Sequence, residues 1–122
     1  MLKTHLDPSD TKPVHMDGVD GVSMRILLGR EHGMENFSMR HFVVEPGGHT
    51  PRHQHPYEHQ VIVLSGNGEA EYDGETQGIE PGEALHVAPG KMHQFRNTGS
   101  EPMQFICMVP HHGQDGCEVP GS

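Results

Sequence analysis

The chain has 122 residues, the length of one domain. Its formal charge of −9 argues against nucleic acid or an anionic membrane surface as a partner. Two cysteines are too few for a disulfide framework, and no stretch approaches the 18 apolar residues of a membrane span. Because the N-terminus also has no apolar signal-peptide core, we expect a soluble, cytoplasmic protein.

The first half of the chain begins with a polar segment, residues 1–20, which contains Pro8 and Pro13. We expect an N-terminal arm there that either frays or lies on a partner subunit. The first strand is predicted at residues 22–28 and the second at 37–44, which should end at Pro46-Gly47-Gly48. Residues 49–55 predict a short edge or irregular strand, since Pro51 lacks a backbone donor.

The second half alternates short apolar runs with turns rich in glycine and proline. No segment keeps a helical apolar period over ten residues, and strands recur every eight to twelve residues. This pattern is typical of an antiparallel, all-β sandwich or barrel. We place the barrel domain at residues 21–110 and a polar C-terminal tail at 111–122, with His111 and His112 in solvent. The predicted strands are 59–64, 69–72, 76–79, 84–88, 92–97 and 103–109.

Three histidines stand close together at positions 53, 55 and 59. On a strand, the alternation of side chains puts His53 and His55 on one face. Neutral imidazole is the commonest protein ligand for divalent transition metals. Two histidines alone would be better interpreted as part of a solvated, histidine-rich turn. With the third histidine, the interpretation we favour is that these residues supply part of a metal site.

The glycine frame around these histidines resembles the first cupin motif: Gly47 or Gly48, then His53, His55, position 59 and Gly66. A second cupin motif is matched by Pro81-Gly82, residues 83–87, Gly90, His93 and Asn97, with its proline displaced by one to Pro89. The resemblance extends over about residues 22–110. It implies a double-stranded β-helix, also called a jelly-roll barrel, with its ligands pointing into a cavity.

The family usually has glutamate in the third ligand slot, where this chain has His59. Glu58 is adjacent, but strand alternation directs it to the other face. The chain thus resembles the small cupins with four histidine ligands, which implies one divalent ion on His53, His55, His59 and His93. Manganese is familiar in that subset, although imidazole suits Fe, Ni, Zn and Cu as well and the usual affinity order disfavours Mn.

Several other side chains have two possible roles. The candidates for the cavity lining are Arg40, Phe95, Phe105 and Cys107. For Cys107 the favoured interpretation is a buried, inert thiol, and for Arg40 it is a surface or structural residue. For His41 and His49 a satisfied or surface position is favoured over a ligand role, and His86 is left open. No residue is assigned a catalytic role.

The resemblance implies a small metalloenzyme, most plausibly an oxidoreductase of the dioxygenase type acting on an apolar or phenolic small molecule. Four neutral imidazoles leave the metal charge uncompensated, which strengthens it as a Lewis acid. The alternatives are a metal-dependent isomerase or decarboxylase without an O2 step, and a non-catalytic module that binds a small ligand or metal. We also expect a homodimer, with the arm and the strand at Val22 exchanged between subunits.

Overall fold

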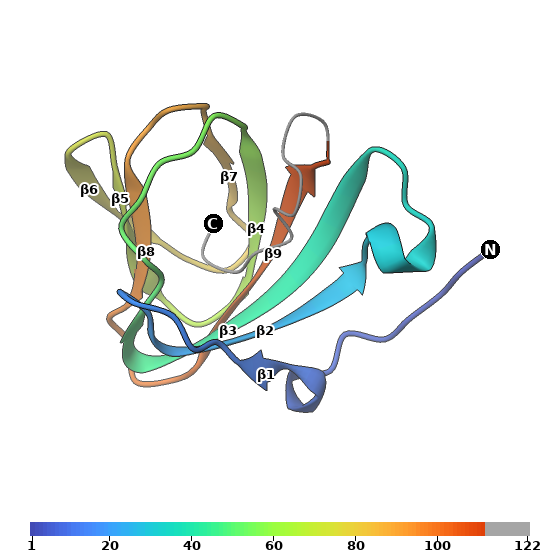
Figure 1. The fold of residues 1–122 in the computed structure, drawn as a ribbon. Helices are drawn as coiled ribbons and strands as arrows, with labels where there is room; N and C mark the ends of the chain where they lie inside the picture. Colours follow the sequence, from blue (N-terminus) through green and yellow to red (C-terminus); the bar gives the residue numbers. More distant parts are fainter. Residues whose placement is uncertain (112–122) are drawn as a thin grey trace.

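The computed structural model describes residues 1–111, which form nine β-strands and two short 3₁₀ helices (Figure 1). The all-β prediction is confirmed. No helix in the described residues is long and apolar enough to cross a membrane. The elements are η1 (Pro8–Asp10), β1 (Lys12–Pro13), β2 (Asp20–Leu28), η2 (Arg30–His32), β3 (Phe37–His49), β4 (His59–Ser65), β5 (Gly68–Tyr72), β6 (Glu75–Ile79), β7 (Ala84–Val87), β8 (His93–Asn97) and β9 (Met103–Pro110).

The strands form one antiparallel sheet that curls into a barrel, as Figure 1 shows. Its main path runs β6-β5-β8-β3-β9-β4-β7, and β2 pairs with β3 beside this path. The 13-residue β3 is the central strand, because it pairs along its length with β2 and β9 and reaches β8 through His49 and Arg96. β6 and β7 are the two ends of the path, so the barrel has a seam between them.

Alternating side chains define an inner and an outer face on each strand. On β4, Val61 and Val63 are buried inside the barrel, whereas Gln60 and Ile62 are exposed outside. The core contains mostly β-branched and aromatic residues, and the rings of Phe42 and Phe105 stack with centroids 5.0 Å apart. Inward positions near the start of β3 and β4 are polar, so the core is apolar at one end of the barrel and polar at the other.

The turn after β4 depends on glycine at position 66, which has φ +78°. A Cβ atom placed there would lie 2.6 Å from the Cα of Met103 and from the carbonyl oxygen of Pro102. Glycine therefore satisfies both the left-handed backbone and the close approach to the start of β9.

Two predictions about strands near the first motif are wrong. β3 does not end at Pro46 but continues to His49. The pairing with β2 shifts register between Asp20 and Val22, and Gly47 has φ +81°, so a bulge absorbs the proline and glycines. The segment 49–55 is not a strand, since beyond β3 it makes only an isolated bridge between His53 and His93.

The two ends of the described chain lie against the barrel. Lys12 and Pro13 pair with β2, and the Arg25 guanidinium donates to the His5 carbonyl and the Thr4 hydroxyl, both at 2.8 Å. The arm thus contacts its own subunit over this stretch. His111, expected in solvent, is only 6% exposed, and its Nε2 lies 2.5 Å from the Ser38 hydroxyl. The rest of the predicted tail, His112 included, lies outside the described residues.

Candidate metal centre

Four histidines from three segments meet at the polar end of the barrel. His93 begins β8 and His59 begins β4, while His53 and His55 come from the segment between β3 and β4. Reciprocal backbone hydrogen bonds of 3.1 and 2.9 Å between His53 and His93 attach that segment to β8. The fold therefore fixes the backbone of the segment beside the strand that supplies His93.

Three of these histidines form a compact cluster. Each of His53, His55 and His93 offers a ring nitrogen, and these atoms all lie within 4.8 Å of one another, a separation at which one ion could bind all three. His59 is not a member of that group, but its Nε2 lies 2.7 Å from the Nε2 of His55. The structure thus brings the four residues singled out in the sequence together, three in one group and the fourth through His55.

The hydrogen bonds of two histidines suit a ligand role. Nδ1 of His55 donates to the Tyr57 carbonyl at 3.1 Å, and Nδ1 of His93 donates to the Lys91 carbonyl at 2.9 Å. A carbonyl only accepts, so each neutral ring has its lone pair on Nε2. Backbone carbonyls commonly orient metal-binding histidines in this way. The Tyr57 ring also stacks on His55, with centroids 4.1 Å apart and planes within 3°.

Burial keeps the cluster neutral. Desolvation and the neighbouring positive charges lower the pKa of His53 and of His55 to about 4, and that of His59 to about 2. Nε2 of His53 is buried without a hydrogen-bond partner among the described residues. A buried ring nitrogen without a hydrogen-bond partner is costly unless it coordinates something. These residues therefore fit a divalent transition metal.

Behind His59 lie two more of the side chains singled out in the sequence. Arg40 on β3 and Cys107 on β9 are cross-strand partners, and both point into the barrel. Nδ1 of His59 is 3.0 Å from the Cys107 sulfur and 3.4 Å from Nη2 of Arg40, which is itself 3.4 Å from that sulfur. The guanidinium also lies 5.4 Å from the centroid of the Phe42 ring.

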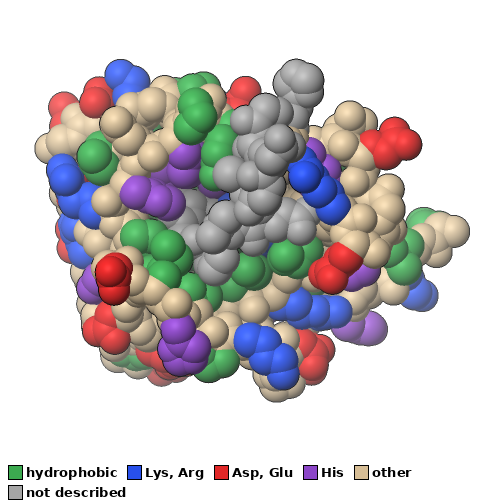
Figure 2. Space-filling model, in the orientation of Figure 1, with side chains coloured by type: hydrophobic (Ala, Val, Ile, Leu, Met, Phe, Trp, Pro, Cys, Tyr) green, Lys and Arg blue, Asp and Glu red, His purple; other side chains and the backbone are tan. Residues whose placement is uncertain are grey.

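A cavity of about 370 Å³ adjoins the cluster at the seam between β6 and β7. Its walls include His93 and Phe95, together with Val87, Leu85 and Tyr72. Phe105 packs against Phe95 and Phe42 in the core. Figure 2 shows several histidine side chains close together to the left of the middle of one face, while others lie separately towards its edges.

Three other histidines that the sequence singled out, His86, His41 and His49, are not members of the cluster. His86 is outside the barrel, with Nε2 3.1 Å from a carboxylate oxygen of Glu58, so Glu58 points away from the four imidazoles. His41 is buried and contacts Gln104 at 2.8 Å, and His49 lies near Gln94. Sequence reasoning missed the Ser38–His111 contact, although Ser38 lies at even spacing from Arg40 on the inner face.

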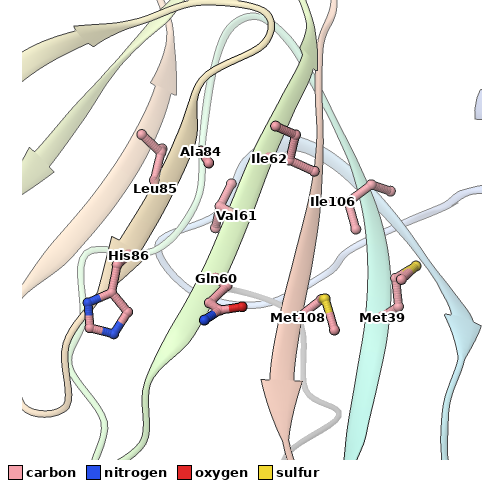
Figure 3. A pocket seen from close by; sticks show the side chains of 9 residues that line it. All are labelled: Met39, Gln60, Val61, Ile62, Ala84, Leu85, His86, Ile106 and Met108. Atoms are coloured by element: carbon pink, nitrogen blue, oxygen red, sulfur yellow. The ribbon is translucent and has the colours of Figure 1, made fainter.

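A second hollow, of about 580 Å³, lies on the outer face of the sheet and contains none of the four clustered histidines (Figure 3). In Figure 3 the side chains of Met39, Ile62, Ile106 and Met108 line this face across β3, β9 and β4, with Gln60 and His86 beside them.

The rolled antiparallel sheet and its inward histidine cluster define a class of small β-barrel proteins. The family model described as Cupin_2, a cupin domain, matches residues 40–109, which is more than half of the chain. The chain therefore belongs to the cupin family, as its two motifs predicted, and its histidine cluster could hold a metal ion.

Among curated proteins, the chain is similar to the 1-methylthio-D-xylulose 5-phosphate methylsulfurylase of Rhodospirillum rubrum. The two are 34% identical over 71 residues, which cover 58% of this chain and 46% of that protein. Auxin-binding protein 1 of Arabidopsis thaliana is 32% identical over 103 residues, covering 75% and 52% of the two chains. This chain spans about half the length of these relatives.

Among solved structures, the polyketide cyclase RemF from Streptomyces resistomycificus superposes with a TM-score of 0.77 and 27% identity, covering 89% of this chain and 80% of that one. A cupin-2 domain from Rhodospirillum rubrum has a TM-score of 0.78 at 24% identity, covering 92% and 76%, which supports the fold alone.

Proposed function

We propose that the chain is a metal-dependent enzyme that binds one divalent ion at His53, His55, His59 and His93 and acts on a small organic molecule. The observation that carries this proposal is the tight group formed by two half-buried histidines, His53 and His55, and buried His93; carbonyls hold His55 and His93 in the tautomer that leaves Nε2 free. A bound ion would supply Lewis-acid chemistry to an oxygen atom of the substrate.

The cavity beside His93 supports a small and largely apolar substrate. Its volume of about 370 Å³ is within the range of small-molecule sites, and Phe95, Val87 and Leu85 supply apolar wall. Its polar lining includes His93, which joins the cavity to the cluster, as well as Tyr72 and Gln77. A molecule with an apolar body and one enol, phenol or carbonyl oxygen would place that oxygen at the histidines.

For the reaction we retain a dioxygenase-type oxidation, with manganese as the favoured metal, as the resemblance to four-histidine cupins implies. A second candidate is a cyclisation or isomerisation without O2. It is supported by the 27% identity to a polyketide cyclase, a protein whose name describes ring closure. In either case the chain's own part is to orient the substrate in the cavity and to exclude water from it.

Elemental analysis of the purified protein, followed by turnover assays, tests the proposal. We expect about one equivalent of a transition metal, and we expect His53→Ala to lose most of it. The matched control is His86→Ala, because His86 is exposed outside the barrel and should leave the metal in place. If His53→Ala and His86→Ala retain equal metal, the site is not at this cluster.

The reaction type is tested with a panel of alkenyl phenols and enols, each assayed with and without O2. A dioxygenase forms no product without O2, whereas a cyclase or isomerase forms the same product under both conditions. A metal-loaded wild type that binds these ligands without turning any of them over, with binding that persists in His53→Ala, would instead support a non-catalytic binding module.

A further inference from the structure

His59 differs from His55 and His93 in what holds its second ring nitrogen. Those two histidines each donate Nδ1–H to a backbone carbonyl. Nδ1 of His59 instead faces the Cys107 sulfur at 3.0 Å and Arg40 Nη2 at 3.4 Å. His59, Arg40 and Cys107 are 1%, 1% and 0% exposed, so solvent has almost no access to these contacts. The tautomer of His59 therefore depends on these two protein groups.

The contacts assign that tautomer in the metal-free protein. His55 has its hydrogen on Nδ1, so its Nε2 can only accept. Nε2 of His59 lies 2.7 Å from Nε2 of His55. The hydrogen between these two atoms must therefore be bonded to Nε2 of His59. The Nδ1 of neutral His59 is left as an acceptor, which matches Arg40, since a guanidinium only donates. In this state His59 has no lone pair directed at the cluster.

We propose that Cys107 is the positioning residue that allows His59 to become the fourth ligand; this inference rests on the proposed metal site. To present a lone pair on Nε2, His59 must carry its hydrogen on Nδ1, so one proton leaves Nε2 and one is bound at Nδ1. Nδ1–H then needs an acceptor. The Cys107 sulfur is one, at 3.0 Å, and Arg40 is not.

The consequence is a site in which backbone carbonyls fix the tautomers of His55 and His93, whereas the tautomer of His59 is conditional. A thiol can donate through S–H or accept through sulfur, so Cys107 matches both tautomers of His59. Without Cys107, only Arg40 would remain at Nδ1, and it would hold His59 in the tautomer that donates to His55. The chain would then bind its ion through three imidazoles.

The binding experiment measures Mn²⁺ affinity by chelator competition for the wild type, Cys107→Ala and Cys107→Ser. We expect Cys107→Ala to bind Mn²⁺ about 10- to 100-fold more weakly, the usual effect of removing a group that orients a ligand. Cys107→Ser keeps a group that can donate and accept, and should stay within a few-fold of the wild type. The control is Val63→Ala, which removes buried volume from β4 four residues from His59 and should leave the affinity unchanged.

A double-mutant comparison separates positioning from general damage. In a His59→Ala background, Cys107→Ala should cause no further loss, because both changes remove the same ligand. An equal loss in both backgrounds would overturn the inference, as would wild-type affinity in Cys107→Ala. A wild type that binds no Mn²⁺, Fe²⁺ or Zn²⁺ would overturn the proposed function as well.

A measurement that needs no metal tests the tautomer directly. In ¹⁵N NMR spectra of the metal-free protein, we expect the hydrogen of His59 on Nε2 and the hydrogens of His55 and His93 on Nδ1. A His59 ring with its hydrogen on Nδ1 in the absence of metal would overturn the inference, whatever the metal affinities.

Discussion

The Nε2 atoms of His55 and His59 lie 2.7 Å apart, in a partly buried contact. Two nitrogen lone pairs repel each other at this distance, so one hydrogen must lie between the rings. This contact closes the cluster without an ion and keeps its histidines near one another. The site is therefore largely preformed, and metal binding should require little rearrangement of the backbone.

Metal removal should lower the thermal stability of the protein without unfolding it. An ion that binds only the folded state stabilises it by mass action, by about 2.7 kcal/mol when the free metal is 100 times its Kd. We expect chelator to lower Tm in differential scanning fluorimetry while circular dichroism at 25 °C stays the same. Added Mn²⁺ should restore Tm in the wild type but not in His53→Ala. An unchanged Tm in the wild type at saturating Mn²⁺ would contradict this.

Stability should also fall in mild acid, and His41 should account for part of the fall. Burial lowers the pKa of His41 below the value of 6.5 in the unfolded chain, against a smaller opposing effect from its hydrogen bond with Gln104. Arg25 also lowers this pKa and Asp7 raises it. Between the two pKa values the unfolded state binds more protons, so stability is full above pH 6.5 and is lost as the pH falls below it.

The matched variant is His41→Gln, which can keep a hydrogen bond to Gln104 but does not titrate. We expect the free energy of unfolding, measured in urea from pH 7.5 to 5, to fall less steeply in His41→Gln than in the wild type. Equal slopes for the two proteins would show that His41 is not protonated differently on unfolding.

Gly66 should tolerate substitution less well than a glycine with a similar backbone in open space. Gly66→Ala forces a Cβ to within 2.6 Å of Met103 Cα at φ +78°. Gly74 has φ +85° with nothing near its Cβ position, so Gly74→Ala carries the backbone strain alone. We expect Gly74→Ala to cost about 1 kcal/mol and Gly66→Ala clearly more, measured by urea unfolding. Equal costs would mean that the turn relaxes around the new methyl group.

The homodimer stays a prediction, and the outer face in Figure 3 is where we place it. Neighbouring outward positions there carry no Asp, Glu, Lys or Arg; they are Met39, His41, Val43, Gln60, Ile62, Leu64, Ala84, His86, Gln104, Ile106 and Met108. A chain with net charge −9 would repel a copy of itself, so a face whose outward strand positions carry no carboxylate favours self-association, with Glu58 beside His86 at its edge. The arm contacts Arg25 beside this face and exposes Leu2 and Leu6, and a two-fold contact would cover both features.

Light scattering at micromolar concentration tests the dimer. We expect a dimer for the wild type and a monomer for Ile62→Lys, because a charge buried between two uncharged faces is costly. Gln77→Lys, on the exposed β6, adds the same charge elsewhere and should remain dimeric. A monomeric wild type would contradict the prediction, and a dimeric Ile62→Lys would place the interface on another face.

The sequence predicted the second half of the fold well for a local reason. From His59 onward, each strand is bounded by glycine or proline turns, and the strands of the structure begin and end within one residue of the expected limits. The predictions failed where long-range pairing decides. β3 crosses Pro46 because β2 lies beside it with a bulge. His111, at the other end of the chain, is held beside the start of β3 by its N–H bond to the Asn36 carbonyl.

Part of the candidate site was predictable because the spacing of motif residues is a local property of the sequence. Motif spacing selected His53, His55, His59 and His93, which the fold brings together. The contact of Arg40 and Cys107 with His59 depends on the register of β3 with β9, which local patterns do not contain. For Cys107, alternation predicted only a candidate position on the inner face.

The central position of β3 has a consequence for how the chain folds as it is synthesised. β3 is made early, but eight of its residues pair with β9, the last strand of the described residues. The edge of β3 that pairs with β9 therefore stays without its partner until β9 has left the ribosome. Pairings between strands so far apart in the sequence form late and slowly. We therefore expect the nascent chain to be prone to aggregation, and to need chaperones, until residue 110 has been synthesised.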